Sequence, residues 1–286
     1  MKRYFLIAAL AALCASPVQA EPQRIVTVGS AVSEAVVVLG AEAELVAVDS
    51  TSVYPPALEK LPKIGYLRAL SAEGVLSLRP TLVLITADAG PRAAVAQLKS
   101  ASIPVVAMPD GHSPATVSET LRRVGTALGR AVAGERLAKR IEGEFAALAA
   151  ALGKRKSSPK VLFILATSSG GLMAGGVNTA ASSIIELAGG ASAVTAYEGY
   201  KPLSAEAAVA AEPDFILLPS HGVASMGGAD AAKAVPQIAL TKAGRSGRVI
   251  VMDSTFLLGF GPRTARAAAD LARRIHPGLA LPDFAP

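Results

Sequence analysis

Short runs of apolar residues alternate with helix-like segments along the first half of the chain. Four such runs predict buried strands, at residues 24–28, 45–48, 81–85 and 103–107. Segments with helical patterns lie between and after them, at residues 33–39, 93–100 and 116–128. Strands that alternate with helices at this spacing predict a parallel sheet that is covered on both faces.

A longer helix is predicted at the midpoint of the mature chain, from about residue 133 to residue 152. Its apolar positions recur on one face: Leu137, Ile141, Phe145, Leu148 and Leu152. At 1.5 Å per residue it would be roughly 30 Å long. The basic, turn-rich segment 153–159 ends it. We expect this helix to be a rigid connector between two lobes.

The second half repeats the alternation of strands and helices. Strands are predicted at 160–165, 215–218 and 248–252, and helices at 182–188 and 264–275. The patterns together predict an α/β fold of two Rossmann-like lobes with parallel sheets, joined by one long backbone helix. We assign residues 21–130 to the N-terminal lobe, 131–155 to the connecting helix and 156–286 to the C-terminal lobe.

An internal repeat supports the division into lobes. Residues 65–73, GYLRALSAE, recur as residues 199–206, GYKPLSAE. Each copy precedes a short apolar segment, a proline (Pro80 or Pro213) and a predicted strand. The two Leu-Ser-Ala-Glu tetrads start 133 residues apart, which is too far for a solenoid repeat. The repeat therefore predicts two similar lobes, each with its own core, and a cleft between them.

Loops rich in glycine and serine follow several predicted strands. They lie at residues 167–171, 175–178, 221–228 and 259–263. In open parallel sheets, ligands bind at the carboxyl ends of the strands. We expect these loops to line the cleft.

Composition favours a folded, exported protein. Of the 286 residues, 51% are hydrophobic and only 17% are charged, which indicates well-filled cores. Residues 1–20 have the pattern of a secretion signal, with Lys2 and Arg3 before an apolar run and Val18-Gln19-Ala20 as the cleavage site. We therefore expect the periplasm as the location. Neither this run nor any later one is long enough to span a bilayer.

Cysteine and charge exclude several classes of partner. Cys14 is the only cysteine, and Leu13 before it is a poor fit to the small residue that precedes a lipid-attachment cysteine. We therefore expect Cys14 to leave with the signal, so the mature chain would have no disulfide and no cysteine metal cluster. The net charge falls from +6 to +4 without Lys2 and Arg3, and the positive residues do not form a stripe with aromatic residues between them. We expect no nucleic-acid partner. A mild positive excess would suit an anionic small ligand, although many exported proteins are basic without a specific reason.

Signatures of enzymes are scarce, and we predict that the protein is not an enzyme. The chain has no nucleotide-binding glycine fingerprint and no Gly-x-Ser-x-Gly elbow. His112, His221 and His276 are far apart in the chain, so they do not suggest a metal site with several histidine ligands. An exported hydrolase would have to use His221 with Ser220 or Ser225, without an ordered triad motif.

Tyr66 is the most informative candidate, because Arg68 follows it two residues on. A neighbouring guanidinium favours the anionic form of a phenol. Tyrosine is an axial ligand of ferric haem in some proteins. The alternative is a half-buried tyrosine at the rim of a domain, and Tyr200 in the second copy could be structural in the same way. A scaffold or adhesion domain would explain the repeat but not the pair of Tyr66 and Arg68.

These residues resemble the periplasmic haem-binding proteins of bacterial haem ABC importers. The resemblance is carried by residues 64–80, IGYLRALSAEGVLSLRP, and by residues 257–263, LLGFGPR. It extends from Arg24 to His276, and its Gly-Tyr segment is the most specific part. It implies two α/β lobes joined by one long helix, with modest lobe movement on binding.

The resemblance also implies a role for several residues. Tyr66 would be the axial ligand of the haem iron, and Arg68 would stabilise the phenolate or contact a propionate. Tyr200 and Lys201 would face the cleft from the second lobe, with Lys201 as a partner for a propionate. Arg263 would cap the following helix or contact a propionate.

His221 is the candidate for the second side of the haem. Some relatives have an arginine in that region, but this chain has no arginine between Arg155 and Arg245. His221 would be a second iron ligand, a hydrogen-bond donor, or a surface histidine without a binding role. Some relatives bind two stacked haems through a histidine near positions 167–169, where this chain has none. We therefore expect one ferric haem b.

Glu73 and Glu206 occupy the same place in the two copies of the repeat, at the start of a short helix. A carboxylate there can cap free backbone donors and interact with the positive end of the helix dipole. In binding proteins of this two-lobed class, one exposed glutamate per lobe docks onto arginines of the membrane permease. The pair would suit a two-fold symmetric permease.

The sequence therefore predicts a monomeric periplasmic solute-binding protein. It would hold one ferric haem and deliver it to the permease dimer of an inner-membrane ABC transporter, downstream of an outer-membrane haem receptor. The alternative cargo is a ferric siderophore or cobalamin. Pockets for those ligands usually use several aromatic residues or arginines, and this chain has no tryptophan.

Overall fold

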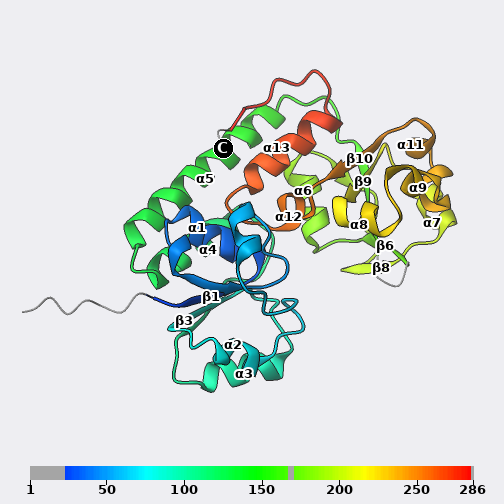
Figure 1. The fold of residues 1–286 in the computed structure, drawn as a ribbon. Coiled ribbons are helices and arrows are strands. Elements are labelled where there is room, and N and C mark those ends of the chain that lie inside the picture. Colours follow the sequence, from blue (N-terminus) through cyan, green and yellow to red (C-terminus); the bar gives the residue numbers. More distant parts are fainter. Residues whose placement is uncertain (1–22, 167–170, 285–286) are drawn as a thin grey trace, which may run out of the picture.

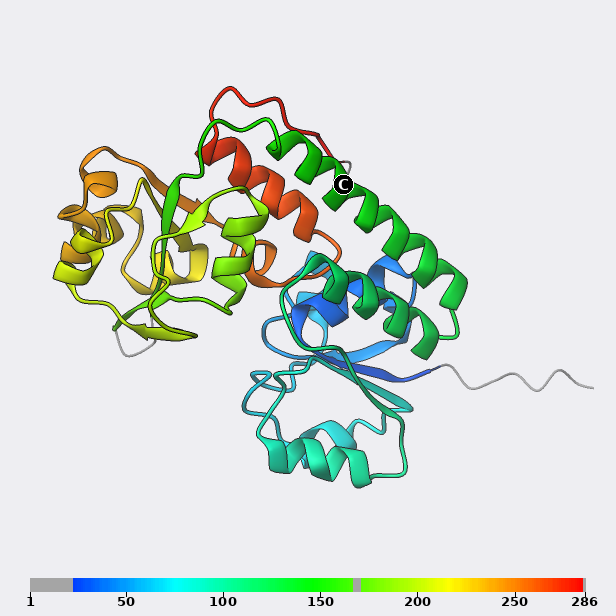
Figure 2. The ribbon, with the colours of Figure 1, turned by 180° about the vertical axis from the view of Figure 1, so that it is seen from behind.

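The computed structural model describes residues 23–166 and 171–284, shown from two opposite sides in Figures 1 and 2. The predicted signal peptide, Cys14 and residues 167–170 of a predicted loop lie outside the described residues. None of the helices in the described part of the chain has the length and apolar character that a membrane crossing requires.

The N-terminal lobe is built on a four-stranded parallel sheet with the order β2-β1-β3-β4. Its strands are β1 (Ile25–Val28), β2 (Leu45–Val48), β3 (Leu82–Ile85) and β4 (Val105–Ala107). These are the four apolar runs that the sequence pattern predicts as strands, and the prediction is confirmed. Ile25 and Val26, which point to opposite faces of the sheet, are both fully buried.

Two helices cover each face of this sheet (Figure 1). On one face lie α1 (Ser30–Val38) and α4 (Pro114–Ala127), and on the other α2 (Ala72–Ser77) and α3 (Arg92–Ser100). Two short 3-10 helices, η1 (Glu42–Glu44) and η2 (Pro56–Lys60), lie before and after β2.

The long helix α5 (Ala131–Leu152) follows α4 and runs along the upper edge of the molecule in both views (Figures 1 and 2). All five apolar positions of the predicted face are buried, namely Leu137, Ile141, Phe145, Leu148 and Leu152. Helix α4 packs closely against α5, because a Cβ atom on Gly125 would lie only 2.8 Å from the Cα atom of Gly134. The predicted long helix is confirmed.

The C-terminal lobe contains a six-stranded sheet with the order β10-β9-β5-β6-β8, in which β7 also pairs with β5. The strands β5 (Lys160–Ala166), β7 (Ala191–Ser192), β9 (Phe215–Pro219) and β10 (Val249–Met252) are parallel. The strands β6 (Leu172–Gly175) and β8 (Tyr200–Pro202) are antiparallel to their neighbours. This edge differs from the predicted parallel sheet, because the connection from Ala166 to Leu172 is too short for the crossover that a parallel neighbour needs.

Helices cover both faces of the second sheet as well. The helices on the face toward α5 are α6 (Ala180–Leu187), α12 (Ser254–Leu258) and α13 (Thr264–Ile275). The other face carries α7 (Ala205–Ala210), α8 (Ser220–Ser225), α9 (Ala229–Ala234), α10 (Pro236–Ala239) and α11 (Lys242–Arg245).

One hydrophobic core runs through both lobes. It joins Ile25 and Leu84 of the first sheet to Phe163 and Leu217 of the second through the buried faces of α5 and α13. Two smaller clusters, beside α2 and α3 and beside α7 to α11, each belong to one lobe. On the sheet faces toward α5 the two lobes share this core, so the prediction of a separate core for each lobe is wrong there. A close-packed core shared by the lobes limits how far they can separate.

The two copies of the repeat have the same local structure. The hydroxyls of Ser71 and Ser204 begin α2 and α7, and each accepts a hydrogen bond at 3.1 Å from the backbone N–H three residues on. Each helix is followed by a residue with left-handed backbone before a proline, at Arg79 (φ 49°) and Glu212 (φ 47°). A buried strand comes next in both lobes, so the repeat marks equivalent structural units.

Candidate functional site

A loop between η2 and α2 presents Tyr66 and Arg68 on the surface of the N-terminal lobe. Gly65 has a φ of +91°, a conformation that favours glycine. Leu67 and Leu70 are buried in the lobe, whereas Tyr66 is 45% exposed. The buried leucines anchor the loop and leave the phenol of Tyr66 accessible to a ligand.

Arg68 contacts both Tyr66 and Asp88. Its Nη1 donates a hydrogen bond to the phenol oxygen of Tyr66 at 2.5 Å, and its Nη2 forms an ion pair with Oδ2 of Asp88. Burial lowers the pKa of Arg68, but the charges of Asp88 and Tyr66 outweigh it, and the net direction is upward. A charged donor therefore faces the phenol oxygen of Tyr66.

His112 and Phe260 border this group. The two ring centroids are 5.0 Å apart in an edge-to-face arrangement. Burial lowers the pKa of His112, while Asp88 and Asp110 oppose this effect and Arg68 adds to it. Phe260 belongs to the predicted loop 259–263, so this loop reaches the N-terminal lobe beside the Tyr66 site.

Asp88 and His112 are site residues that the sequence analysis misses. Asp88 follows β3 and His112 follows β4, which are neighbouring strands. The carboxyl ends of parallel strands meet at one edge of the sheet. The positions of Asp88 and His112 in the loops after two predicted strands were therefore a signal in the sequence that could have identified both residues.

Tyr200 and Lys201 lie on the edge strand β8 of the other lobe. Burial raises the pKa of Tyr200, and Thr179, the Ala181 backbone and the positive charge of Arg68 offset this in part. Arg68 belongs to the N-terminal lobe, so the Tyr66 loop is close enough to β8 for the charge of Arg68 to act on Tyr200. The phenol of Tyr200 stays protonated near neutral pH.

The basic residue of the second copy is arranged differently from that of the first. The Nζ atom of Lys201 lies 4.8 Å from the ring centroid of Tyr197, whereas Arg68 bonds to the hydroxyl of Tyr66. Tyr66 and Tyr200 are therefore matched in sequence position but not in electrostatic environment.

His221 lies in α8, directly after β9 and Ser220. Its Nδ1 is 2.6 Å from Oγ of Ser254, and its backbone N–H donates to the same oxygen at 3.1 Å. Among the residues that the structure describes, no hydrogen bond or ion pair joins His221 to Tyr66 or Arg68. Because Nδ1 is engaged, Nε2 is the ring atom that could contact a ligand.

The serines considered for a hydrolase do not bond to this imidazole. Oγ of Ser225 donates to the backbone carbonyl of His221 at 2.9 Å, and Oγ of Ser220 lies 3.2 Å from Oγ of Ser254. The arrangement expected of a serine hydrolase with Ser220 or Ser225 as nucleophile is not formed.

Arg263 forms a bidentate ion pair with Glu34 of α1, at 2.8 Å and 3.0 Å. The two side chains are only 16% and 7% exposed, and the guanidinium carbon of Arg263 lies 3.5 Å from the ring centroid of Tyr54. Burial raises the pKa of Glu34, against the opposing effects of Arg263 and Arg266. The Arg263 side chain makes no capping hydrogen bond to α13. It links the segment before α13 to the N-terminal lobe.

Glu73 and Glu206 are exposed in the first turns of α2 and α7. The side-chain caps of these helices come from Ser71 and Ser204, so the helices do not depend on the glutamates for a cap. A hydrogen bond from its own backbone N–H and one from Ser204 lower the pKa of Glu206. Both carboxylates are available to a partner.

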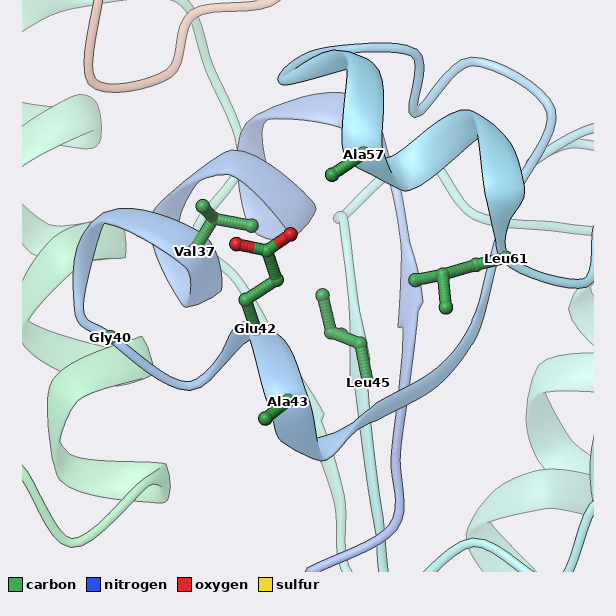
Figure 3. Close-up of a pocket in the computed structure, with 7 residues that line it drawn as sticks. All are labelled: Val37, Gly40, Glu42, Ala43, Leu45, Ala57 and Leu61. Carbon is green, nitrogen blue, oxygen red and sulfur yellow. The ribbon is translucent and has the colours of Figure 1, made fainter.

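Figure 3 shows a pocket of about 600 Å³ elsewhere on the N-terminal lobe. Its lining is mainly aliphatic: Val37, Gly40, Glu42, Ala43, Leu45, Ala57 and Leu61. The carboxylate of Glu42 lies between Val37 and Ala57 (Figure 3). The lining has neither a cation nor an aromatic ring, so this pocket lacks the groups that an anionic aromatic ligand needs.

Metal binding by several protein side chains is not indicated. Within residues 23–166 and 171–284, no group of three or more His, Cys, Asp or Glu side chains could hold a metal ion. At the Tyr66 site the carboxylate of Asp88 is paired with Arg68, and the phenol of Tyr66 is an accessible oxygen donor. Such a site suits a metal that brings most of its ligands with it.

A model of the periplasmic binding protein family matches residues 25–255 of the chain. Two solved structures are similar over most of the molecule. The periplasmic heme-binding protein BhuT in complex with two hemes is 40% identical with a TM-score of 0.83, over 90% of this chain and 99% of that chain. The periplasmic heme-binding protein RhuT from Roseiflexus sp. RS-1 in apo form is 40% identical with a TM-score of 0.84, over 88% and 97%.

Curated relatives are more distant. The uncharacterized ABC transporter substrate-binding lipoprotein YvrC of Bacillus subtilis is 26% identical over 266 residues, which are 91% of this chain and 82% of the relative. A vitamin B12-binding protein of Pectobacterium carotovorum is 30% identical over only 105 residues, 37% of this chain and 38% of the relative.

Proposed function

The chain belongs to the periplasmic binding protein family, and from this premise we propose that it is a haem-binding protein of a bacterial haem importer. It captures one ferric haem between its lobes through Tyr66 and delivers it to an ABC transporter of the inner membrane. The observation that carries the proposal is the phenol of Tyr66, exposed on an anchored loop and bonded to a charged arginine. The two similar haem-binding structures support the same ligand.

Binding needs an anionic oxygen for the iron and cations for the propionates. The phenol of Tyr66 supplies the oxygen, and the hydrogen bond from Arg68 compensates the negative charge that develops on it. Lys201, exposed on β8, is the proposed partner of a propionate. Tyr200 remains protonated and can donate a hydrogen bond from the facing lobe. His112 is exposed and offers ring surface at the edge of the site, and the buried ring of Phe260 packs against it.

The proposal gives His221 and Arg263 smaller roles in haem binding. His221 can approach the open side of the iron only through Nε2, because Ser254 occupies Nδ1. Arg263 is bonded through Nε and Nη2 to Glu34, and contact with a propionate would compete with this ion pair. We propose that Arg263 mainly joins the lobes.

Cobalamin is the second candidate cargo. Two kinds of relative support it: a vitamin B12-binding protein that is 30% identical over 37% of the chain, and a cobalamin-binding protein that is 26% identical over 90% of the chain. Both are less similar to this chain than the two haem-binding structures, which are 40% identical over 90% and 88% of it. The pair of Tyr66 and Arg68 has a direct use in ferric iron binding and none that is evident for cobalamin. A ferric siderophore has no support among the observations here beyond the shared family.

An absorption titration of the mature protein with ferric haem tests the proposal. We expect saturation at one equivalent, with a tyrosinate-to-iron charge-transfer band, and no saturable spectral change with cobalamin. His221→Ala in the same titration should keep the band, and a changed coordination spectrum would identify His221 as a second ligand. Saturation at two equivalents would contradict the single haem, and no saturation with haem would contradict the function.

The permease contact can be tested separately from haem binding. The protein would reach the periplasm by its signal peptide and dock as a monomer through Glu73 and Glu206. Like charges across a docking interface cost several kcal/mol, so the double variant Glu73→Arg/Glu206→Arg should lower affinity for the transporter by more than about tenfold. Stimulation of ATP hydrolysis by the transporter in liposomes measures this.

Matched controls define the result of the docking experiment. Glu59→Arg/Glu186→Arg also reverses one exposed glutamate per lobe and should leave the stimulation unchanged. Haem affinity should be the same in both double variants. Equal loss of stimulation in both would point to net charge and not to a docking site at Glu73 and Glu206.

A further inference from the structure

Asp88 binds the same guanidinium that donates to Tyr66. Nη1 of Arg68 bonds to the phenol oxygen of Tyr66, and Nη2 bonds to Oδ2 of Asp88. Tyr66 and Arg68 share one loop, whereas Asp88 comes from the loop after β3. A planar guanidinium that bonds to two partners on separate loops has little freedom left to reorient.

We propose that Asp88 is a positioning residue of the haem site. It holds Arg68 against the oxygen of Tyr66, so that Arg68 is a fixed hydrogen-bond donor to the iron ligand and not the partner of a propionate. This inference rests on the proposed function. Two roles are open for Arg68 from the sequence, stabilising the phenolate of Tyr66 or contacting a propionate, and this inference selects the first.

Asp88 has two opposing effects on a tyrosinate at Tyr66. It fixes the donor that stabilises the phenolate, but its own negative charge disfavours another negative charge nearby. The carboxylate is in direct contact with Arg68, which neutralises most of its charge, while the bond from Arg68 to Tyr66 is direct. The positioning effect is therefore the larger one.

The strength with which Asp88 positions Arg68 depends on bound haem. The side chains of Arg68 and Asp88 are 56% and 44% exposed, so water weakens the ion pair in the free protein. Haem bound over the Tyr66 loop would displace that water. The hydrogen bonds on both sides of Arg68 would then strengthen.

Asp110 provides a matched control for Asp88. It lies in the next loop at the same edge of the sheet, and both carboxylates act on His112. Oδ1 of Asp110 accepts a hydrogen bond from the backbone N–H of Gly111 at 2.8 Å. Among the described residues it has no ion pair with Arg68, so Asp110→Asn removes a nearby charge without releasing Arg68.

The first test needs no haem. Nitrogen NMR of the arginine side chains in the haem-free protein follows Arg68, whose signals are identified by their loss in Arg68→Lys. We expect the guanidinium signals to be sharper and to exchange more slowly in the wild type and in Asp110→Asn than in Asp88→Ala. Unchanged Arg68 signals in Asp88→Ala would overturn the proposal, whether or not the protein binds haem.

The second test measures the affinity for ferric haem and the position of the charge-transfer band. Asp88→Ala should weaken binding by about tenfold or more and shift the band. Asp88→Asn keeps an acceptor oxygen, so its affinity for ferric haem should stay within about threefold of the wild-type affinity. The affinity of Asp110→Asn should also stay within about threefold of the wild-type affinity. Equal or tighter binding by Asp88→Ala would overturn the proposal. If the wild type binds no haem, the proposed function fails, and the NMR result still decides whether Asp88 positions Arg68.

Discussion

Tyr66→Phe is expected to weaken the binding of ferric haem by at least about 100-fold and to abolish the tyrosinate-to-iron charge-transfer band. The substitution removes only the phenol oxygen, which accepts the hydrogen bond of Arg68 at 2.5 Å. Loss of an outer-shell partner lowers metal affinity by about 10- to 100-fold, so loss of the ligand itself should reach the upper end of that range. Absorption titration of the variant beside the wild type measures both effects.

Tyr200→Phe is the matched control, because Tyr200 holds the same place in the second copy of the repeat. Its side chain is 36% exposed, against 45% for Tyr66. Burial raises the pKa of Tyr200, and a protonated phenol is a weak ligand for ferric iron. Loss of a single hydrogen bond from this residue should change the affinity by less than about tenfold. A larger loss in Tyr200→Phe than in Tyr66→Phe would move the iron ligand to the other lobe.

The elements of the fold could be predicted from the sequence where burial is strong and regular. The face of α5 from Leu137 to Leu152 follows helical spacing, and every predicted position on it is buried. The repeat also located equivalent units, because Ser71 and Ser204 begin helices that end before a proline and a strand. In each case the signal lies within a few neighbouring residues.

The edge of the second sheet could not be predicted in this way. Segment 172–175, LMAG, is too short and too rich in small residues to have a clear strand pattern. Its strand β6 is defined by pairing, with Ala174 opposite Ile164 on one side and Lys201 on the other. This pairing places Tyr200 and Lys201 on a strand rather than in a loop.

The contacts of the site could also be predicted only where they are local in the sequence. The spacing of Tyr66 and Arg68 suggests their contact, because two residues on one loop can meet. The contact of Arg68 with Asp88 joins two loops, and that of Glu34 with Arg263 joins residues 229 positions apart. Such contacts depend on how the strand ends and the lobes assemble, and a single sequence holds no local signal for them.

Glu34→Met is expected to lower the free energy of unfolding of the haem-free protein by about 3–5 kcal/mol, because it leaves the guanidinium of Arg263 buried without its partner. The Arg263 side chain is 16% exposed, and arginine cannot lose its charge by deprotonation. Contact with Tyr54 at 3.5 Å offsets only part of this cost. Urea unfolding of the variant and the wild type measures the difference.

The reverse substitution and the double variant test whether the ion pair is the cause. Arg263→Met should cost less than Glu34→Met, because burial already raises the pKa of Glu34 and an unpaired carboxylate can take up a proton. Glu34→Met/Arg263→Met replaces both charges with apolar groups and should recover at least about 2 kcal/mol relative to Glu34→Met. If the double variant is instead as unstable as the sum of the single variants, the loss comes from packing at α1. Haem affinity in Arg263→Met then separates the two roles of this arginine, since a residue that joins the lobes should affect stability more than binding.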